Sequence, residues 1–457
     1  MNVRNIVCIG AGYVGGPTMA VIADRCPDVR VTVVDVNEAK IAAWNSEALP
    51  VFEPGLPEVV QRARGRNLFF APLTPQVLAE ADMIFVCVNT PTKAYGEGAG
   101  MAADLQYWEK SARTILAHAR PGTIVVEKST VPVRTAEAIS RILNQSNRDE
   151  VFPVLSNPEF LAEGTAVQDL VAPERVLIGS SNSSVGEAAA RELGAIYEYW
   201  VAPEHVLYTS VWSSELAKLT ANAMLAQRVS SINAMSALCE KSGADVTELS
   251  RAVGMDGRIG QRFLEAGVGF GGSCFRKDIL NLSYIAGQLG LQQVADYWRS
   301  VVDINDYQID RFCKGILENM FNTVAGKRLA VFGFAFKPGT DDVRDAPAIR
   351  VCTRLLDEHA ELAVTDPQAL DNARAALDGL PGTVHYLADP YAAVAGAHAL
   401  VVCTQWPQFR ELDYERIFAS MEKPAFVFDG RNCLDHERLY DIGFNVVPIG
   451  KAPMRHY

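Results

Sequence analysis

The amino-terminal stretch constrains the fold of this chain more than any other part of it. An apolar run, Asn5-Ile6-Val7-Cys8-Ile9, passes directly into Gly10-Ala11-Gly12-Tyr13-Val14-Gly15, and residues 17–23 are compatible with a helix. A strand, a G-x-G-x-x-G turn and a helix in this order are the fingerprint of a dinucleotide-binding unit. The glycines allow a tight turn, close approach of the backbone to a pyrophosphate, and close packing of the helix. The chain is therefore expected to begin with such a domain.

A second apolar strand is expected at 31–34, and it ends in Asp35. An acid at this distance from the glycine turn binds the ribose hydroxyls of the adenosine, which favours NAD over NADP. The weaker alternative is a glycine turn in an α/β domain that binds no nucleotide.

Further strands are expected at 83–88, 123–127 and 151–155, and each leads into a polar loop. These loops contain Asn89-Thr90-Pro91-Thr92, Lys128-Ser129-Thr130-Val131-Pro132, and 156–164 with Glu159 and Glu163. Open parallel sheets bind ligands at the carboxyl ends of their strands, so these loops are candidate site segments. Ordinary turns and solvated carboxylates remain the alternative.

The middle of the chain is expected to be helical. No proline or glycine occurs from Val211 to Cys239, and apolar residues recur at helical spacing, which predicts one long helix. Lys218 and Asn222 share a face of it, and the lysine either extends to solvent or points inward as a cation. A second helical run at 291–320 would complete an all-α dimerisation region between two α/β domains.

A glycine-rich loop follows, and its last residues resemble the start of a helix. Gly267, Gly269, Gly271 and Gly272 precede Ser273-Cys274-Phe275-Arg276-Lys277-Asp278. We expect exposed backbone N–H groups near a ligand, Ser273 as N-cap, and Cys274 in the first turn, where the helix dipole favours a thiolate. Asp278 would lie on the same face. The alternative is a small buried cysteine beside a structural turn.

The last third repeats the strand and turn theme. Strands at 327–333, 361–365 before Asp366, 399–403 and 426–428 predict a second doubly wound sheet, here without a full G-x-G-x-x-G. A nucleotide-like ligand other than the dinucleotide is expected. In the 334–344 loop, Phe336 is a candidate to stack on a base or sugar, and Lys337 and Arg344 to meet phosphate.

Composition narrows the function classes. With 457 residues, two to three domains are expected, and a net charge of -12 argues against nonspecific nucleic-acid binding and an anionic membrane surface. Nine scattered cysteines without C-x-x-C spacing indicate a reducing cytosol, with neither disulfides nor zinc, and no metal is expected. Glycines interrupt the first apolar run, so it is not a secretory signal, and a cytoplasmic protein is expected.

Motifs along nearly the whole chain resemble the UDP-glucose/GDP-mannose dehydrogenase family. They are GAGYVGGPT, NTPT, EKSTVPV, SNPEFLAEGTA, ELAKLTANAMLAQR, GFGGSCFRKD, GFAFKPGTDDVRD and DGRN. The resemblance implies an α/β protein with two Rossmann-like doubly wound domains joined by a central all-α dimerisation region with a long helix. The implied domains are 1–211 for NAD, 212–323 for dimerisation and 324–457 for the UDP-sugar.

The resemblance also implies site residues. The catalytic set would be Cys274 as covalent nucleophile with Lys218, Asp278, Asn222, Glu159 and Thr130. The NAD set would be Gly10, Gly12, Tyr13, Val14, Gly15, Asp35, Lys40, Thr90, Thr130, Glu163 and Arg344. The substrate set would be Phe160, Leu161, Lys218, Asn222, Phe263, Phe270, Gly271, Phe336, Lys337 and Arg431, with Arg258 supplied by a second subunit.

The implied activity is a four-electron oxidation of UDP-glucose to UDP-glucuronate, using two NAD and one water, through a thiohemiacetal and a thioester on Cys274. The same chemistry on GDP-mannose or a UDP-N-acetylhexosamine is the alternative. An idle NAD-sensing or scaffold protein is a third, against which the joint presence of Cys274, Lys218 and Asp278 argues. A homodimer at least is expected, with a hexamer left open. Glu265, Asn432 and the end at Tyr457 depart from animal relatives.

Overall fold

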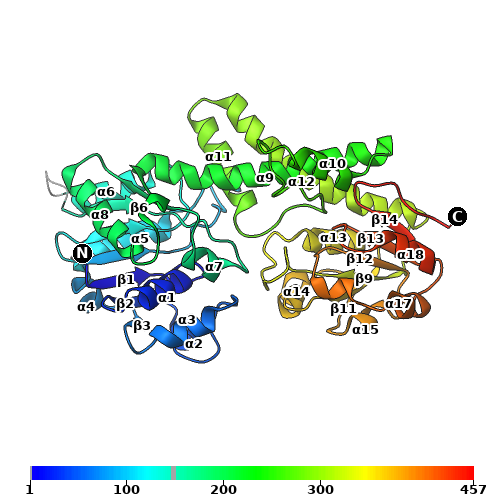
Figure 1. The fold of residues 1–457 in the computed structure, drawn as a ribbon, viewed down its shortest axis with the longest axis horizontal. Helices are drawn as coiled ribbons and strands as arrows, with labels where there is room; N and C mark the ends of the chain where they lie inside the picture. The colour runs from blue at the N-terminus through cyan, green and yellow to red at the C-terminus, as the bar shows by residue number, and fades with distance from the viewer. Residues whose placement is uncertain (1–2, 146–150, 457) are drawn as a thin grey trace. The chain divides into compact units, whose positions relative to one another are not determined.

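The computed structural model describes residues 3–145 and 151–456, which form two compact units (Figure 1). The amino-terminal unit spans Met1–Ala221 and the carboxy-terminal unit Asn222–Tyr457. A 32-residue helix, α9 (Val211–Ser242), runs across the boundary and extends the predicted long helix by one turn. None of the helices in the described ranges is both long and apolar enough to cross a membrane.

The amino-terminal unit is built on an eight-stranded sheet in the order β3-β2-β1-β4-β5-β6-β7-β8. All neighbouring strands are parallel except β6 and β7. The strands are β1 (Asn5–Ile9), β2 (Arg30–Asp35), β3 (Leu68–Pro72), β4 (Met83–Val86), β5 (Ile124–Glu127), β6 (Val154–Ser156), β7 (Val176–Ser180) and β8 (Val206–Ser210). Strands β1 to β6 therefore have the 3-2-1-4-5-6 order of a dinucleotide-binding fold.

Helices cover both faces of this sheet, which explains its continuous apolar strands. In β1, Ile6 and Cys8 enter one core cluster while Val7 and Ile9 enter another on the opposite face. The helices are α1 (Gly15–Arg25), α2 (Glu38–Trp44), α3 (Leu56–Ala63), α4 (Pro75–Ala79), α5 (Gln106–His118), α6 (Thr135–Asn144), α7 (Ala166–Val171) and α8 (Ser184–Tyr197), with a short 3-10 helix at Pro203–His205.

The carboxy-terminal unit contains helices and a second sheet. After α9 come α10 (Val246–Gly254), α11 (Phe275–Gln288) and α12 (Gln292–Asn319). The six parallel strands are β9 (Arg328–Phe332), β10 (Glu361–Thr365), β11 (Thr383–Tyr386), β12 (Ala399–Val402), β13 (Phe426–Asp429) and β14 (Asn445–Pro448). Their order, β11-β10-β9-β12-β13-β14, is again doubly wound, which confirms the second predicted sheet.

Alternate residues of β9 again enter opposite clusters, Leu329 and Val331 on one face, Ala330 and Phe332 on the other. The covering helices are α13 (Pro347–Asp357), α14 (Leu370–Leu377), α15 (Pro390–Val394), α16 (Pro407–Arg410), α17 (Tyr414–Ser420) and α18 (His436–Ile442). The sequence patterns predicted the central strands of both sheets but not the edge strands β3, β8, β11 and β14, nor β7, which lies between β6 and β8.

Candidate functional site

The glycine turn after β1 has the geometry that a bound pyrophosphate requires. Gly10 has φ +109°, and a Cβ there would lie 2.4 Å from the carbonyl oxygen of Cys87. A Cβ at Gly15 would lie 2.0 Å from the Gly10 oxygen, whereas a Cβ at Gly12 would meet no atom within 4 Å. Gly10 and Gly15 are therefore needed for packing, and Gly12 leaves the open backbone that lets a phosphate approach. Tyr13 and Val14 complete the turn, partly buried.

Asp35 ends β2 beside this turn. Its Oδ2 accepts from the Ala11 N–H at 2.9 Å and lies 3.2 Å from Nζ of Lys40, and its Oδ1 accepts from the Asn37 N–H at 2.9 Å. Burial opposes ionisation of Asp35, but these N–H groups and the lysine hold its pKa below the ordinary value. A fixed negative charge therefore lies where ribose hydroxyls bind. The turn and this acid fit an NAD molecule.

The structure brings together three catalytic candidates at the carboxyl edge of the same sheet. Thr90 donates to the carbonyl of Thr130 at 2.8 Å, and Thr130 Oγ1 lies 3.5 Å from Oε1 of Glu159. That same Oε1 lies 3.8 Å from Nζ of Lys218 on α9, with 8% and 6% of the two side chains exposed. A threonine hydroxyl, a carboxylate and a lysine thus meet within the amino-terminal unit.

Oε2 of Glu159 is buried and has no hydrogen-bond partner among the described atoms. An unpaired buried carboxylate oxygen is costly, which makes this atom a candidate to accept a hydrogen bond from a ligand or a water. Phe160 lies next to it, with Lys218 Nζ 5.5 Å and Arg175 Cζ 3.9 Å from its ring centre. Leu161 and Glu163 are partly buried in the loop that follows.

Three buried acids near this edge were not selected from the sequence. Glu53 binds both the glycine turn and the 159–166 loop. Glu215 accepts from the N–H groups of Arg134 and Ala136, both at 2.7 Å, and burial raises its pKa to about 7. Burial, and then the charge of Glu215, raise the pKa of Glu127. The residues that these acids contact are distant in sequence, so no local spacing of residues predicts the contacts.

Cys274 differs from the other cysteines of the chain. All nine lie in the described residues; eight are buried and Cys274 is partly exposed. The structure corrects the predicted cap, because α11 begins at Phe275 and Cys274 itself occupies the N-cap position. Its Sγ lies 3.4 Å from Oγ of Ser273. The thiol still lies at the start of a helix, the end of the helix dipole that favours a thiolate.

Asp278 lies one turn further along α11 and is held by α9. Its N–H donates to the Cys274 carbonyl at 2.9 Å, and its Oδ2 accepts from Nδ2 of Asn222 at 2.6 Å. Lys277 Nζ lies 3.6 Å from Oδ1. A buried carboxylate is thereby fixed one turn from the thiol.

The glycine-rich loop before Cys274 differs from expectation. Four of its N–H groups already donate to protein acceptors: Gly267 donates to Asn233, Val268 to Gly430, Phe270 to Asn305 and Gly272 to Arg344. The glycines instead allow close packing. A Cβ at Gly271 would lie 2.5 Å from the Asp345 oxygen, one at Gly272 3.0 Å from the Phe336 ring, and one at Gly267 2.7 Å from an Arg431 nitrogen.

The remaining substrate candidates of the carboxy-terminal unit vary in exposure. Phe270 is buried, and Phe336 and Lys337 are partly buried, with Lys337 Nζ 5.4 Å from the Phe336 ring centre. Arg431 donates to the Cys403 carbonyl at 2.7 Å, and burial lowers the pKa of its guanidinium.

Three other candidates lie at the surface. Arg258 and Arg344 pair with the acids two residues before them, Asp256 and Asp342, each at 2.6 Å. Phe263 is 41% exposed and has φ +63°, an unusual conformation for an aromatic residue.

The acid that ends the equivalent strand of the second sheet is fully engaged. Oδ2 of Asp366 accepts from the N–H groups of Phe334, Ala335 and the Trp406 indole at 2.7, 3.0 and 3.0 Å. Its Oδ1 accepts from two further backbone N–H groups. No acceptor is left for ribose hydroxyls, which agrees with a ligand other than a dinucleotide in this domain.

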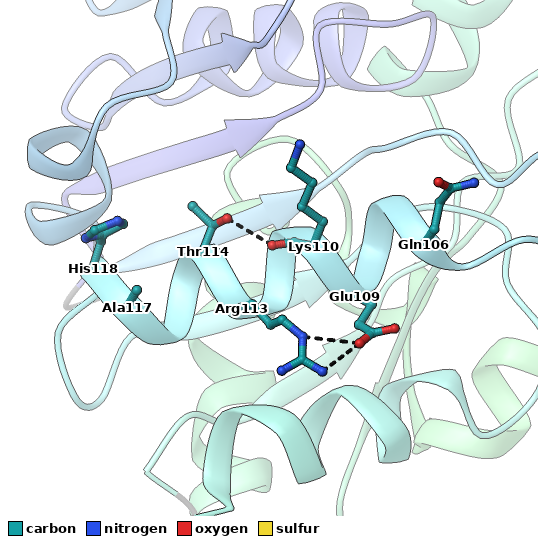
Figure 2. Close-up of a pocket in the computed structure, with 7 residues that line it drawn as sticks. All are labelled: Gln106, Glu109, Lys110, Arg113, Thr114, Ala117 and His118. Carbon is teal, nitrogen blue, oxygen red and sulfur yellow. Dashed lines mark hydrogen bonds and ion pairs between the residues drawn. The ribbon is translucent and has the colours of Figure 1, made fainter.

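A hollow along α5 contains none of the predicted site residues (Figure 2). It is lined by Gln106, Glu109, Lys110, Arg113, Thr114, Ala117 and His118. Glu109 and Arg113 pair with each other at 2.6 Å, so these two lining charges already satisfy each other.

The sheet order, the glycine turn and the acid after β2 define an NAD-binding α/β protein of the doubly wound class. Three domain descriptions of the UDP-glucose/GDP-mannose dehydrogenase family match the chain. They are the NAD binding domain at residues 4–201, the central domain at 212–307 and the UDP binding domain at 330–436. The chain belongs to this family, and NAD is its cofactor.

Known proteins resemble the chain over nearly its full length. UDP-glucose 6-dehydrogenase 1 of Oryza sativa subsp. japonica is 56% identical, over 98% of this chain and 97% of the relative. UDP-glucose 6-dehydrogenase of Gallus gallus is 55% identical, over 98% and 94%. The solved UDP-glucose dehydrogenase from the archaeon Pyrobaculum islandicum is 32% identical with a TM-score of 0.83, covering 97% and 98%.

Proposed function

We propose that this protein oxidises the C6 alcohol of UDP-glucose to the carboxylate of UDP-glucuronate, through a covalent intermediate on Cys274. One observation carries the proposal: the only partly exposed cysteine lies at the start of α11, one turn from the buried Asp278 that Asn222 holds. The high identity to curated UDP-glucose 6-dehydrogenases supports the choice of sugar nucleotide.

NAD, when bound at the glycine turn, accepts the hydride of each of two successive oxidations. In the first, the hydroxyl at C6 loses its proton to a base as C6 loses a hydride, and an aldehyde results. Asp278 and Lys218 are the proposed proton acceptors, acting through a water. Both are buried, which strengthens their interactions with a polar substrate.

The thiolate of Cys274 then adds to the aldehyde carbon to form a thiohemiacetal. Its oxyanion would be stabilised by the charge of Lys218 and the amide of Asn222, four residues apart on α9. Loss of the second hydride and of the hydroxyl proton gives a thioester. Water, deprotonated by Glu159 with Thr130 beside it, attacks the thioester carbon, releases the carboxylate and returns the thiol.

The assignment of ligands to parts of the chain is also proposed. Residues 1–211 would bind NAD, 324–457 the UDP-sugar, and 212–323 would form a dimer in which Arg258 of one subunit serves the other. The exposed, locally paired guanidinium of Arg258 is compatible with a partner's phosphate replacing Asp256.

The test is the stoichiometry of turnover. Purified protein should release two NADH for each UDP-glucose, with UDP-glucuronate as product. GDP-mannose and a UDP-N-acetylhexosamine, assayed under the same conditions, should give at most a small fraction of that rate. A higher rate with either would transfer the proposal to that substrate. A single NADH for each sugar, with an aldehyde released, would refute the covalent route.

A further inference from the structure

Glu53 is a buried acid that joins two segments of the amino-terminal unit, because its side chain accepts hydrogen bonds from described residues that are distant in sequence. It lies between α2 and α3 with 3% of its surface exposed. Oε2 accepts from the Tyr13 hydroxyl and from the Gly164 N–H at 2.8 Å, and Oε1 accepts from the Ala166 N–H at 2.5 Å. One carboxylate thus binds the glycine turn and the loop at 159–166.

The hydrogen bonds of Glu53 are suited to couple the position of the glycine turn to that of the 159–166 loop. Three donors compensate the burial of a charge that would otherwise cost several kcal/mol. The Gly164 N–H also lies 3.3 Å from the Tyr13 oxygen, so turn, acid and loop form one closed set of bonds. Burial, and then the bond to Glu53, raise the pKa of Tyr13, so its hydroxyl remains a donor at neutral pH.

Both joined segments have a place in the proposed chemistry. The turn receives the pyrophosphate of NAD, and the loop carries Glu159, whose buried Oε2 has no partner among the described atoms. Glu53 is therefore the hydrogen-bonded link between the turn and the loop.

We propose that Glu53 is a positioning residue that couples NAD binding at the glycine turn to the ordering of the 159–166 loop. The coupling rests on NAD binding, and its consequence for water activation by Glu159 rests on the proposed function. Without Glu53, NAD still meets the turn, but the loop no longer responds.

Hydrogen–deuterium exchange of the full-length protein tests the coupling without turnover. In the wild-type protein, saturating NAD should slow amide exchange across residues 159–166. Tyr13→Phe removes only the hydroxyl link, and Glu53→Gln turns an amide NH₂ toward a backbone donor. Both variants should lose this protection at saturating NAD. Their dissociation constants for NAD should rise about tenfold, as expected for a lost bond to a charged group.

The double variant and a control separate coupling from stability. Tyr13→Phe/Glu53→Gln should weaken NAD binding no more than Glu53→Gln alone, because both remove the same link. Asp82→Asn is the control: Asp82 accepts from the Arg4 and Asn5 N–H groups at 2.9 and 3.0 Å, at the opposite end of β1. It should lower the melting temperature and leave NAD protection intact.

Protection that persists in Tyr13→Phe and Glu53→Gln would overturn the inference, as would its absence in the wild-type protein. Failure to oxidise UDP-glucose would refute the proposed function alone, since the exchange measurement contains no sugar nucleotide.

Discussion

Nδ2 of Asn222 donates a 2.6 Å hydrogen bond to Oδ2 of Asp278, and both side chains are buried. The bond ties α9 to α11 one turn after Cys274. Asn222 therefore has two functions in the proposal. It orients the carboxylate beside the thiol, and its amide stabilises the oxyanion together with Lys218, which lies one helical turn before it.

Asn222→Ala should lower both activity and stability. Among the described residues, the buried carboxylate of Asp278 would keep the 3.6 Å contact to Lys277, and we expect the free energy of unfolding in urea to fall by about 1–3 kcal/mol. The kcat should fall about 100-fold or more, because proton transfer depends on the placement of Asp278. Gln227→Ala, which removes a 3.2 Å bond between α9 and Tyr297 of α12, is the matched control and should change kcat little. Equal losses in both variants would contradict a specific role for Asn222.

Cys274 should be the preferred site of alkylation in the native protein. Because the other eight cysteines are buried, brief iodoacetamide treatment should label Cys274 and abolish turnover in proportion. Peptide mass spectrometry locates the label, and prior addition of UDP-glucose should slow it. Labelling of all nine only after unfolding is the internal control. Full activity in a protein labelled at Cys274 would exclude it as the nucleophile.

Glu159→Gln should trap the thioester. The amide keeps the shape of the side chain but cannot take a proton from water, so hydrolysis should become rate-limiting. A rapid burst of two NADH for each active site should precede slow turnover, and intact-protein mass spectrometry should detect the adduct. Cys274→Ala on the Glu159→Gln background should remove the adduct. A burst without an adduct would assign Glu159 to another step.

The acids that end β2 and β10 should have different functions although they occupy equivalent positions. Asp35→Asn should raise the KM for NAD about tenfold and reduce the preference for NAD over NADP, because the negative charge near the ribose is lost. Asp366→Asn should leave the KM for NAD unchanged and cost about 1–3 kcal/mol, because an amide NH₂ would oppose backbone donors. Steady-state kinetics with both cofactors and urea unfolding measure these effects. The assignment fails if Asp366→Asn weakens NAD binding.

The parts that sequence predicts are those encoded within a few residues. The run from Asn5 through Gly15 specifies strand, turn and helix locally, and the uninterrupted helical periodicity after Val211 specifies α9. The spacing of Cys274 and Asp278 likewise places both at the start of one helix. In each case the pattern reflects local backbone geometry.

The parts that sequence does not predict depend on distant partners. Glu53 meets Gly164 across 111 positions, and its own surroundings of proline and glycine resemble any turn. The glycine loop was expected to offer N–H groups to a ligand, but Asn233 and Asn305, 34 and 35 residues away, accept two of them. Glycine spacing encodes the freedom of the backbone and not the identity of what packs against it.

The buried pair Glu127 and Glu215 should make stability depend on pH. Burial raises both folded pKa values, Glu215 to about 7, above those of the unfolded chain. Between the unfolded and folded values the folded protein holds protons that the unfolded chain has lost, so this contribution to stability falls as pH rises. For Glu215 the loss from pH 4.5 to 7 is about 3 kcal/mol.

Glu127→Gln should reduce this dependence. The amide resembles the protonated acid, and Oε2 of Glu127 has no hydrogen-bond partner among the described atoms to lose. The variant should match the wild-type free energy of unfolding near pH 5 and exceed it increasingly toward pH 8, as measured by urea titration. The substitution also removes the repulsion between the charges of Glu127 and Glu215, which adds to the gain in stability at high pH. Glu109→Gln, an exposed acid of α5 paired with Arg113, should instead run parallel to wild type. Parallel curves for Glu127→Gln would show that Glu127 does not change its protonation on unfolding.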